Sequence, residues 1–208
     1  MRWNSDKRCL LDLAGRGVAV VPPQFVAPGG HLRAEDFDQA CGVVVKPAAS
    51  AGATDIARYE PGRHADAVRH ARMLLDQGRT AMVQPYQSLI EAGERAPVFC
   101  AGAFSHAIRK EPLLTEPGVI GRFRVPHPGA APYRPAEQEV RAARAALAAV
   151  PSAQVPLFAR VDLTPAEARE PVVMERELLG PPLFLGSDPQ GLRRFVDAVA
   201  AEGRALSL

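Results

Sequence analysis

Short apolar runs that end at proline or glycine recur along this chain, and they limit the folds that it can adopt. The segments GVVVKP, TAMVQPY and PVFCAG have strand length and are closed by residues that break secondary structure. Helical spacing of apolar residues appears over 66–77 and 136–150. This mixture of short strands and amphipathic helices predicts an α+β fold.

A seam is expected at Gln84–Pro85, where a strand pattern runs into a loop. It divides the chain into two α+β lobes, residues 1–84 and 85–208. The local patterns also predict helices over 7–15, 32–41 and 188–206. They predict single strands over 17–22 and 55–60, a hairpin over 97–110, and two further strands over 156–164 and 171–178. Asp188 is the expected cap of the last helix.

Charge and composition exclude several classes of function. The 208 residues carry a formal net charge of +2 with scattered arginines, so we expect no nucleic-acid partner. No apolar run approaches the ~18 residues of a membrane span, and the start of the chain lacks an apolar signal-peptide stretch. The three cysteines are far apart and match no zinc pattern, which predicts reduced thiols in a cytoplasmic protein.

Only three lysines stand among 22 arginines, so each lysine needs an explanation. Lys7 opens an apolar helical pattern, Lys46 ends the buried strand pattern VVVKP, and Lys110 ends the run FSHAIRK. An ammonium group is a compact charge that suits a single phosphate oxygen, whereas a guanidinium is a planar fork. The lysines therefore indicate a phosphate site, with chance placement as the alternative.

A loop of small residues, AASAGAT, follows Lys46. Ser50 and Gly52 in this loop would let the backbone approach a phosphate and offer N–H donors to it. Neither the GxxxxGK[ST] pattern nor a GxGxxG pattern after a strand is present. The loop is a candidate phosphate cradle, and an ordinary hairpin turn is the alternative.

Three carboxylates can converge near the end of the chain. Glu175 and Glu177 alternate on one predicted strand and so share a face, as do Arg160 and Asp162 on the preceding strand. If the strands pair, repulsion among the acids favours a cation between them, and oxygen-only ligands suit Mg²⁺. The alternative is a solvated face of mixed charge, although the flanking runs VVM and LLGPPLFL are apolar.

The strand 103–110 and the loop 112–135 hold further candidates. Arg109 can grip a phosphate with both arms of its guanidinium, and Lys110 lies beside it. His106, in an apolar strand, is more typical of a core residue than of a catalyst. Arg124 in the Pro- and Gly-rich loop contacts an anionic substrate or is solvated, and a loop of this length is typical of a lid or binding loop.

Six motifs then occur in a fixed order: WNSDKRCLLDL, VVVKPAASAGAT, MVQPYQSLIEAGERAP, AFSHAIRK, ARVDL and VMERELLGPPLFL. Together they resemble the ATP-grasp superfamily, most closely its bacterial glutathione-synthetase-like branch, to which ligases of cycloserine biosynthesis belong. The resemblance covers Trp3 to about Leu185. It implies two α+β lobes that hold ATP between antiparallel sheets.

The resemblance also implies roles for individual residues. Lys7 and Lys46 match the lysines on the ATP phosphates, and Arg109 matches the arginine near the transferred phosphate. The implied Mg²⁺ ligands are Asp162, Glu175 and Glu177. Two further roles rest on the resemblance alone. Gln84, Pro85 and Tyr86 match the hinge beside adenine, and Glu94 matches the acid on the ribose hydroxyls.

The implied reaction is a ligation driven by ATP. A substrate carboxylate attacks the γ-phosphate to give an acyl phosphate and ADP, and an amine or related nucleophile then displaces phosphate. Relatives carry an N-terminal domain ahead of the first motif, so we expect it to be absent here. A homodimer, or a partner subunit that supplies this domain, is the expected assembly. A truncated ATP-binding chain without ligase activity, and a plain interaction module with exposed acids, are the alternatives.

Overall fold

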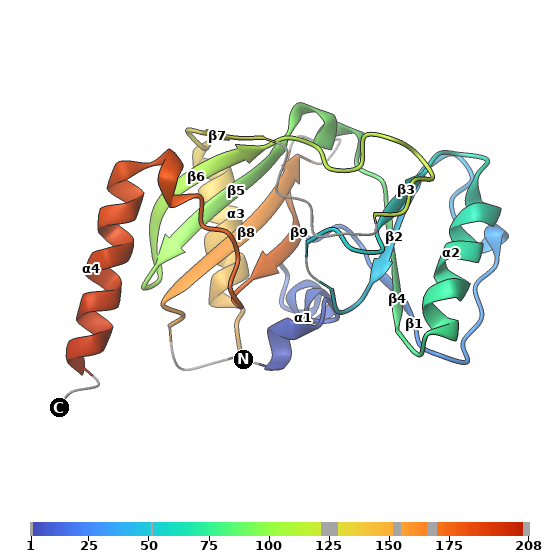
Figure 1. Cartoon of the computed structure of the whole chain (residues 1–208), viewed down its shortest axis with the longest axis horizontal. Coiled ribbons are helices and arrows are strands. Elements are labelled where there is room, and N and C mark those ends of the chain that lie inside the picture. The colour runs from blue at the N-terminus through green and yellow to red at the C-terminus, as the bar shows by residue number, and fades with distance from the viewer. Residues whose placement is uncertain (1, 51, 122–128, 152–154, 166–169, 206–208) are drawn as a thin grey trace.

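The computed structural model of the chain describes residues 2–50, 52–121, 129–151, 155–165 and 170–205. Its strands form two antiparallel sheets that lie beside each other, with α1 (Cys9–Gly15) between them at the lower middle of Figure 1. This arrangement confirms the predicted α+β fold. The division into lobes at residue 84 stays a prediction.

The smaller sheet has the strand order β1-β4-β2-β3. Its members are β1 (Gln24–Val26), β4 (Ala81–Pro85), β2 (Val43–Pro47) and β3 (Ala57–Tyr59). Alternate residues of β2 enter a hydrophobic core under α2 (His64–Asp76), among them Val43 and Val45. The intervening residues Val44 and Lys46 therefore face the opposite side of the sheet, and that side is the one turned toward the second sheet.

The larger sheet has the order β7-β6-β5-β8-β9. Its strands are β5 (Glu94–Cys100), β6 (Ala103–Lys110), β7 (Ala130–Pro132), β8 (Phe158–Pro165) and β9 (Pro171–Glu177). The β5–β6 hairpin and the β8–β9 pairing were both predicted. Helix α3 (Glu137–Ala148) covers one face and adds Ala143 and Ala146 to the core.

Arg176 occupies the α3 side of β9, so it points away from its neighbours Glu175 and Glu177. Its guanidinium lies 4.1 Å from the ring centroid of Trp3 and donates to the carbonyl of Ala146 at 2.9 Å. An arginine between the two acids therefore serves the packing of α3 and the N-terminal segment. It does not enter the cluster of charges on the other face.

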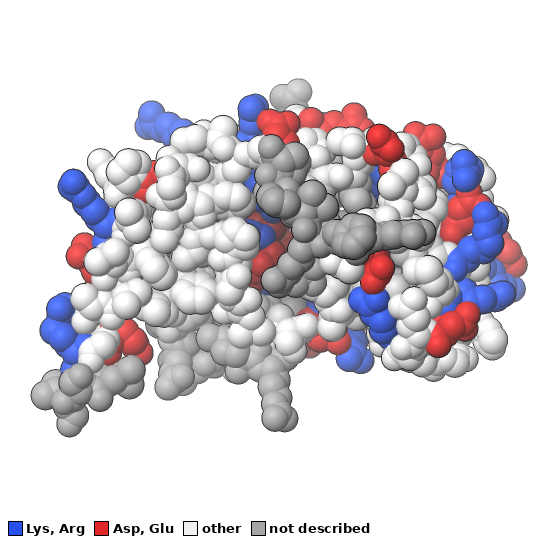
Figure 2. Space-filling model, viewed as in Figure 1, with Lys and Arg blue, Asp and Glu red and all other residues white. Residues whose placement is uncertain are grey.

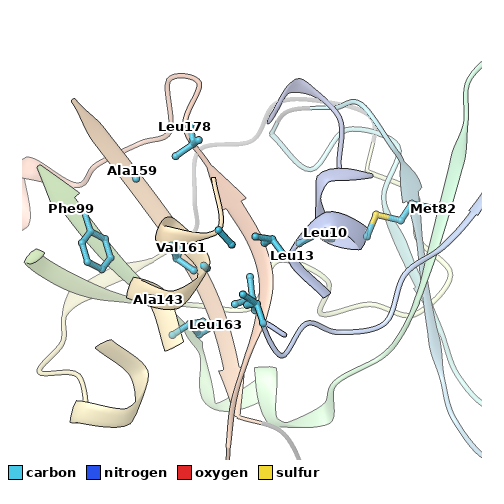
Figure 3. Packing of buried hydrophobic residues seen from close by; sticks show 13 residues of the cluster. Leu10, Leu13, Met82, Phe99, Ala143, Ala159, Val161, Leu163 and Leu178 are labelled. Carbon is cyan, nitrogen blue, oxygen red and sulfur yellow. The ribbon is translucent and has the colours of Figure 1, made fainter. Parts of the chain in front are cut away.

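Helix α1 joins the two sheets through its apolar side. Leu10 and Leu13 pack with Met82 of the small sheet and with Val161 and Val173 of the large one (Figure 3). Both leucines are almost completely buried. Since one short helix contributes to the contact with both sheets, its packing helps to fix their separation.

Helix α4 (Pro189–Ala205) closes the described chain at the far side from α2 (Figure 1). The backbone N–H of Gly191 donates to the Asp188 carboxylate at 2.6 Å, which confirms the predicted cap. A Cβ on Gly191 would come within 2.5 Å of Nδ1 of His106, so only glycine allows this close approach. His106 is buried there and its Nε2 bonds to the carbonyl of Leu183 at 2.8 Å.

Two predicted elements are wrong. Residues 17–22 make only an isolated bridge between Val20 and Val173, because Pro22 and Pro23 lack the N–H groups that a longer ladder needs. Residues 32–41 contain only the 3-10 helix η2 (Ala34–Asp36). The Asp36 carboxylate accepts from the N–H of Arg33 at 2.8 Å, and such local bonds compete with a longer helix.

The short 3-10 helices η1 (Arg2–Ser5), η3 (Ser88–Ala92) and η4 (Leu185–Ser187) complete the described elements. Strand β7 lies in the loop 112–135, where no element was predicted. No described helix is long and apolar enough to cross a membrane.

The packing of α1 leads to a first prediction. Replacing Leu13, which is 0% exposed, with alanine leaves a cavity in the core cluster that α1 shares with residues of both sheets. We expect Leu13→Ala to lower the free energy of unfolding by about 3 kcal/mol, the usual cost of such a cavity. Leu11→Ala on the same helix is the control, because Leu11 is 48% exposed. Urea unfolding measures both, and equal losses in the two variants would contradict this account.

Candidate active site

A cavity of about 820 Å³ lies between the two sheets. Strands from both sheets and the start of α1 line it, and in Figure 2 basic and acidic atoms adjoin each other in the recess at the middle of the molecule. The residues predicted for phosphate, nucleotide and metal binding that line this cavity are Lys7, Lys46, Ser50, Gly52, Gln84, Pro85, Tyr86, Glu94, Lys110, Asp162, Glu175 and Glu177. Candidates from distant parts of the sequence thus meet at one place.

All three lysines of the chain are buried in this cavity. Lys7, Lys46 and Lys110 are 8%, 6% and 5% exposed. Lys7 donates to the carbonyl and the hydroxyl of Ser50 at 3.2 and 3.3 Å, and it lies 3.2 Å from the Glu175 carboxylate. One ammonium group therefore connects the small-residue loop to the large sheet.

Lys46 stands at the end of β2 on the cavity face of the small sheet. Burial lowers the pKa of this lysine, and the neighbouring Lys7 adds to that effect, while Glu175 opposes it. A buried ammonium beside a second lysine is stabilised by an anion between them. Its environment is thus suited to a phosphate group.

The three predicted acids lie on paired strands and line the same cavity. In the β8–β9 register Arg160 pairs with Glu177 and Asp162 pairs with Glu175. Directly opposed residues share a face, and this face is the one that lines the cavity. Each acid nevertheless lies against a cation of the protein.

Asp162 is held by two cations at the floor of the cavity. Nε and Nη2 of Arg160 donate to its two oxygens at 2.8 and 2.9 Å, and Nζ of Lys110 donates at 2.9 Å. Burial alone would raise the pKa of Asp162, but Arg160 and Lys110 outweigh it and keep the pKa well below its usual range. Arg160 also bonds to Glu177, so the guanidinium bridges two of the predicted metal ligands.

Glu177 differs from the other two acids. Its burial, together with the nearby charges of Asp162 and Glu175, raises its pKa to about 7, although Arg160 acts in the opposite direction. The pKa of Glu175 is lowered instead, because Lys7 and Lys46 outweigh the effect of its burial. The same group of acids therefore contains one carboxyl whose charged form is disfavoured by burial, Glu177, and one whose charged form is favoured by two lysines, Glu175.

The described residues contain no group of three His, Cys, Asp or Glu side chains that would hold a metal ion by themselves. The donor chemistry does fit Mg²⁺, which binds through one or two carboxylates and completes its shell with water and substrate phosphates. Glu177, with its raised pKa, is an oxygen donor that a cation would stabilise in the charged form.

The predicted hinge, residues 84–86, lies where β4 leaves the small sheet. The side chain of Gln84 donates to the carbonyl of Val21 at 2.9 Å, and Gln84 pairs with Val44 in the β2–β4 ladder. The N–H of Tyr86 donates to the carbonyl of Gly42 at 2.8 Å. Glu94, on the neighbouring β5, forms an ion pair with Lys110.

Of the candidates on β6, Lys110 lines the cavity and Arg109 does not. Arg109 is about half exposed and its guanidinium lies 3.9 Å from Glu111, because alternation along β6 turns Lys110 inward and Arg109 outward. Arg124 lies outside the described residues. Arg160 had been placed on the face of Asp162 but given no role, and its i, i+2 spacing to that acid was the available signal.

Comparison with known proteins identifies the family. The chain is 36% identical over 212 residues to the cycloserine biosynthesis protein DcsG of Streptomyces lavendulae, which covers 96% of this chain and 70% of DcsG. The chain belongs to the ATP-grasp ligases. The crystal structure of D-cycloserine synthetase DcsG matches this ATP-grasp ligase with a TM-score of 0.86 and 34% identity, over 97% of this chain and 71% of DcsG.

More distant structures share the fold. The D-alanine–D-alanine ligase of Bacillus anthracis complexed with ATP matches with a TM-score of 0.65 and 16% identity, over 97% of this chain and 66% of that one. The ATP-grasp ligase PsnB complexed with its minimal precursor gives 0.61 and 13%, over 95% and 60% of the two chains. No family model matches the sequence. The predicted family is confirmed, and this ATP-grasp ligase is an ATP-dependent enzyme that forms C–N bonds.

The raised pKa of Glu177 leads to a second prediction. Its folded-state pKa of about 7 exceeds the ordinary 4.5, so the folded protein binds more protons than the unfolded chain between these values. Its contribution to stability is therefore lost as pH rises from 4.5 to 7. Glu177→Gln cannot titrate at this position. We therefore expect the free energy of unfolding of the variant, minus that of the native protein, to increase as pH rises through this range.

Chemical unfolding at pH 5 and pH 8 measures this difference. Glu137→Gln is the control, because the side chain of Glu137 is 89% exposed. A gap between Glu177→Gln and the native protein that stays constant with pH would contradict the assigned charge cluster.

Proposed function

We propose that this chain binds Mg·ATP in the cavity between its sheets and uses it to join a carboxylate to an amine or related nucleophile through an acyl phosphate. The observation that carries the proposal is the burial of all three lysines in one cavity, facing carboxylates. Burying charged groups is unfavourable unless partners compensate for lost water. A triphosphate with its cation supplies both kinds of partner.

The nucleotide would lie across the cavity from the hinge to the acids. Adenine would contact the backbone at Gln84–Tyr86, and Glu94 would accept hydrogen bonds from the ribose hydroxyls. The phosphates would lie between Lys7 and Lys46, beside the small-residue loop that contains Ser50 and Gly52. In this arrangement the two lobes, residues 1–84 and 85–208, hold ATP between them.

The groups proposed to hold Mg²⁺ are Asp162, Glu175 and Glu177. When bound, the ion would offset negative charge on the phosphoryl oxygens. The protein itself contributes Arg160 and Lys110, which hold Asp162 in place and add positive charge near the same point. Because Asp162 already accepts from both cations, Glu175 and Glu177 are the acids with more freedom to change partners.

The reaction would proceed in two transfers. A carboxylate oxygen of the acid substrate attacks the γ-phosphorus, the bond to the bridging oxygen breaks, and ADP leaves. The amine then attacks the acyl carbon, loses a proton, and expels inorganic phosphate. The buried cations stabilise charge on the transferred phosphoryl group, and a cavity closed to water protects the acyl phosphate from hydrolysis. Arg109 and Arg124 stay untested as contacts of that group.

Similarity to a D-cycloserine synthetase supports small amino-acid-like substrates for this reaction. Cys9, Cys41 and Cys100 form no disulfide bonds, and this, together with the use of ATP, supports a cytoplasmic enzyme. Because the chain spans 70% of DcsG, ATP binding without ligation by this chain alone is the second candidate. A partner subunit would then complete the enzyme.

Calorimetric titration of Mg·ATP into the purified chain tests the proposal. We expect micromolar binding, and we expect Lys46→Ala to weaken it by at least about tenfold, the usual value of a hydrogen bond to a charged group. Arg33→Ala is the control, because Arg33 is an exposed cation whose partners are Glu35 and Asp36. Circular dichroism establishes that each variant is folded.

Two outcomes decide between the candidates. Mg·ATP binding with ADP release that depends on an added amino acid supports the ligase, whereas binding without such release supports the second candidate. Absence of Mg·ATP binding by a folded native chain would contradict both.

A further inference from the structure

Arg58 has contacts that no role assigned so far explains. It lies in the middle of β3 and pairs with Val44 of β2, which in turn pairs with Gln84 of the hinge strand. Directly opposed residues share a face, so Arg58 stands on the cavity side of the small sheet. Its side chain is only 15% exposed.

The guanidinium of Arg58 connects three separate segments. Its carbon lies 4.9 Å from the ring centroid of Tyr86 in the hinge. Nη1 is 3.3 Å from the Glu91 carboxylate on η3, and Nη2 donates to the carbonyl of Thr115 at 2.8 Å. The hydroxyl of Tyr86 also donates to Glu91 at 3.1 Å, so these groups form a closed set of contacts.

Thr115 belongs to residues 112–121, which we call the wall segment. Pro112, Leu113 and Leu114 at its start line the nucleotide cavity. Leu113 is 42% exposed, so apolar burial contributes little to holding this end of the segment in place. The polar contact with Arg58 follows directly after these residues.

The far end of the wall segment is held by backbone hydrogen bonds and by Ile120, which packs against the core of the small sheet. The N–H groups of Gly118 and Gly121 donate to the carbonyls of Arg58 and Ile56 at 2.7 and 3.0 Å. A Cβ on Gly121 would come within 2.3 Å of the carbonyl oxygen of Ala53, so this end lies directly on the small-residue loop. Arg58 is thus the side chain that joins the wall segment to the hinge.

We propose that Arg58 is a positioning residue that holds the wall segment against Tyr86 and so forms the base end of the nucleotide cavity. The inference rests on the proposed ATP site. In it, Arg58 contacts protein groups around the base end of the cavity and does not contact the phosphates. A guanidinium is suited to this role because its planar fork can stack on an aromatic ring and donate to two acceptors at once. Lysine would retain the charge and one acceptor but lose the fork.

The position of Arg58 makes its effect separable from that of Lys46. Adenosine fills the base end of the cavity only, and inorganic tripolyphosphate fills the phosphate end only. We expect Arg58→Gln to weaken adenosine binding by about tenfold, in keeping with the loss of one cation–π contact and one charged hydrogen bond. Tripolyphosphate binding should stay unchanged in Arg58→Gln.

The experiment is a calorimetric titration of each probe into the native protein and three variants. Arg58→Lys should recover part of the adenosine affinity, and Arg69→Gln should leave it unchanged, because Arg69 is an exposed cation on α2 paired with Asp66. Amide hydrogen exchange of the wall segment is the second readout. It should be at least about tenfold faster in Arg58→Gln at equal global stability, since local opening sets exchange rates.

The outcomes separate this inference from the proposed function. If native protein binds Mg·ATP but Arg58→Gln keeps both its adenosine affinity and its slow exchange in residues 112–121, the positioning role is refuted and the ATP site stands. Equal loss of adenosine and tripolyphosphate binding would also refute it, because it would show general damage to the cavity. Failure of the native protein to bind Mg·ATP refutes the proposed function first.

Discussion

The arrangement of this protein depends on the compensation of charge inside one cavity. Three buried cations there form ion pairs with carboxylates. Lys7 pairs with Glu175, Lys110 pairs with Glu94 and Asp162, and Arg160 pairs with Asp162. Removing such groups from water is costly, and the cost is met only when their hydrogen-bonding groups find partners. The pairs of Lys110 and Arg160 compensate charge within the larger sheet, and Lys7, which directly precedes α1, adds a pair with Glu175 of β9.

The same compensation explains how the cavity can change state. Lys7 binds Ser50 and Glu175, so it links the small-residue loop to β9. A triphosphate with its cation would offer a new anion to the lysine and a new cation to the acid. After this exchange of partners, each buried charge would still have a partner of opposite charge. The site can therefore be ordered before its ligand binds.

Much of this site was predictable because strand alternation is a strict rule. The i, i+2 spacing of Glu175 and Glu177 placed both acids on one face, and the structure confirms that face as the lining of the cavity. The same rule should have favoured Lys110 over Arg109, since neighbours on a strand cannot both face the cavity. The phosphate-binding chemistry of a guanidinium and the family resemblance both selected Arg109, but the geometry of β6 turns its guanidinium toward solvent.

Other features depend on contacts that no local pattern encodes. The segment 17–22 is as apolar as β2, yet it pairs with β9 at only one bridge, because its prolines and its place beside the edge of β9 limit the ladder. The role of Arg160 between Asp162 and Glu177 required the register of β8 and β9. The contact of Arg58 with Thr115 joins residues 57 positions apart, so only the folded chain reveals it.

The central claim is that the three lysines form one nucleotide site, and a single spectrum can test it. Selective ¹³C and ¹⁵N labelling of lysine side chains should give one signal for each of Lys7, Lys46 and Lys110, since the chain has no other lysine. We predict that titration with Mg·ATP shifts all three signals with the same concentration dependence. A lysine whose signal stays unchanged at saturating Mg·ATP, or one that follows a different binding curve, would contradict the claim.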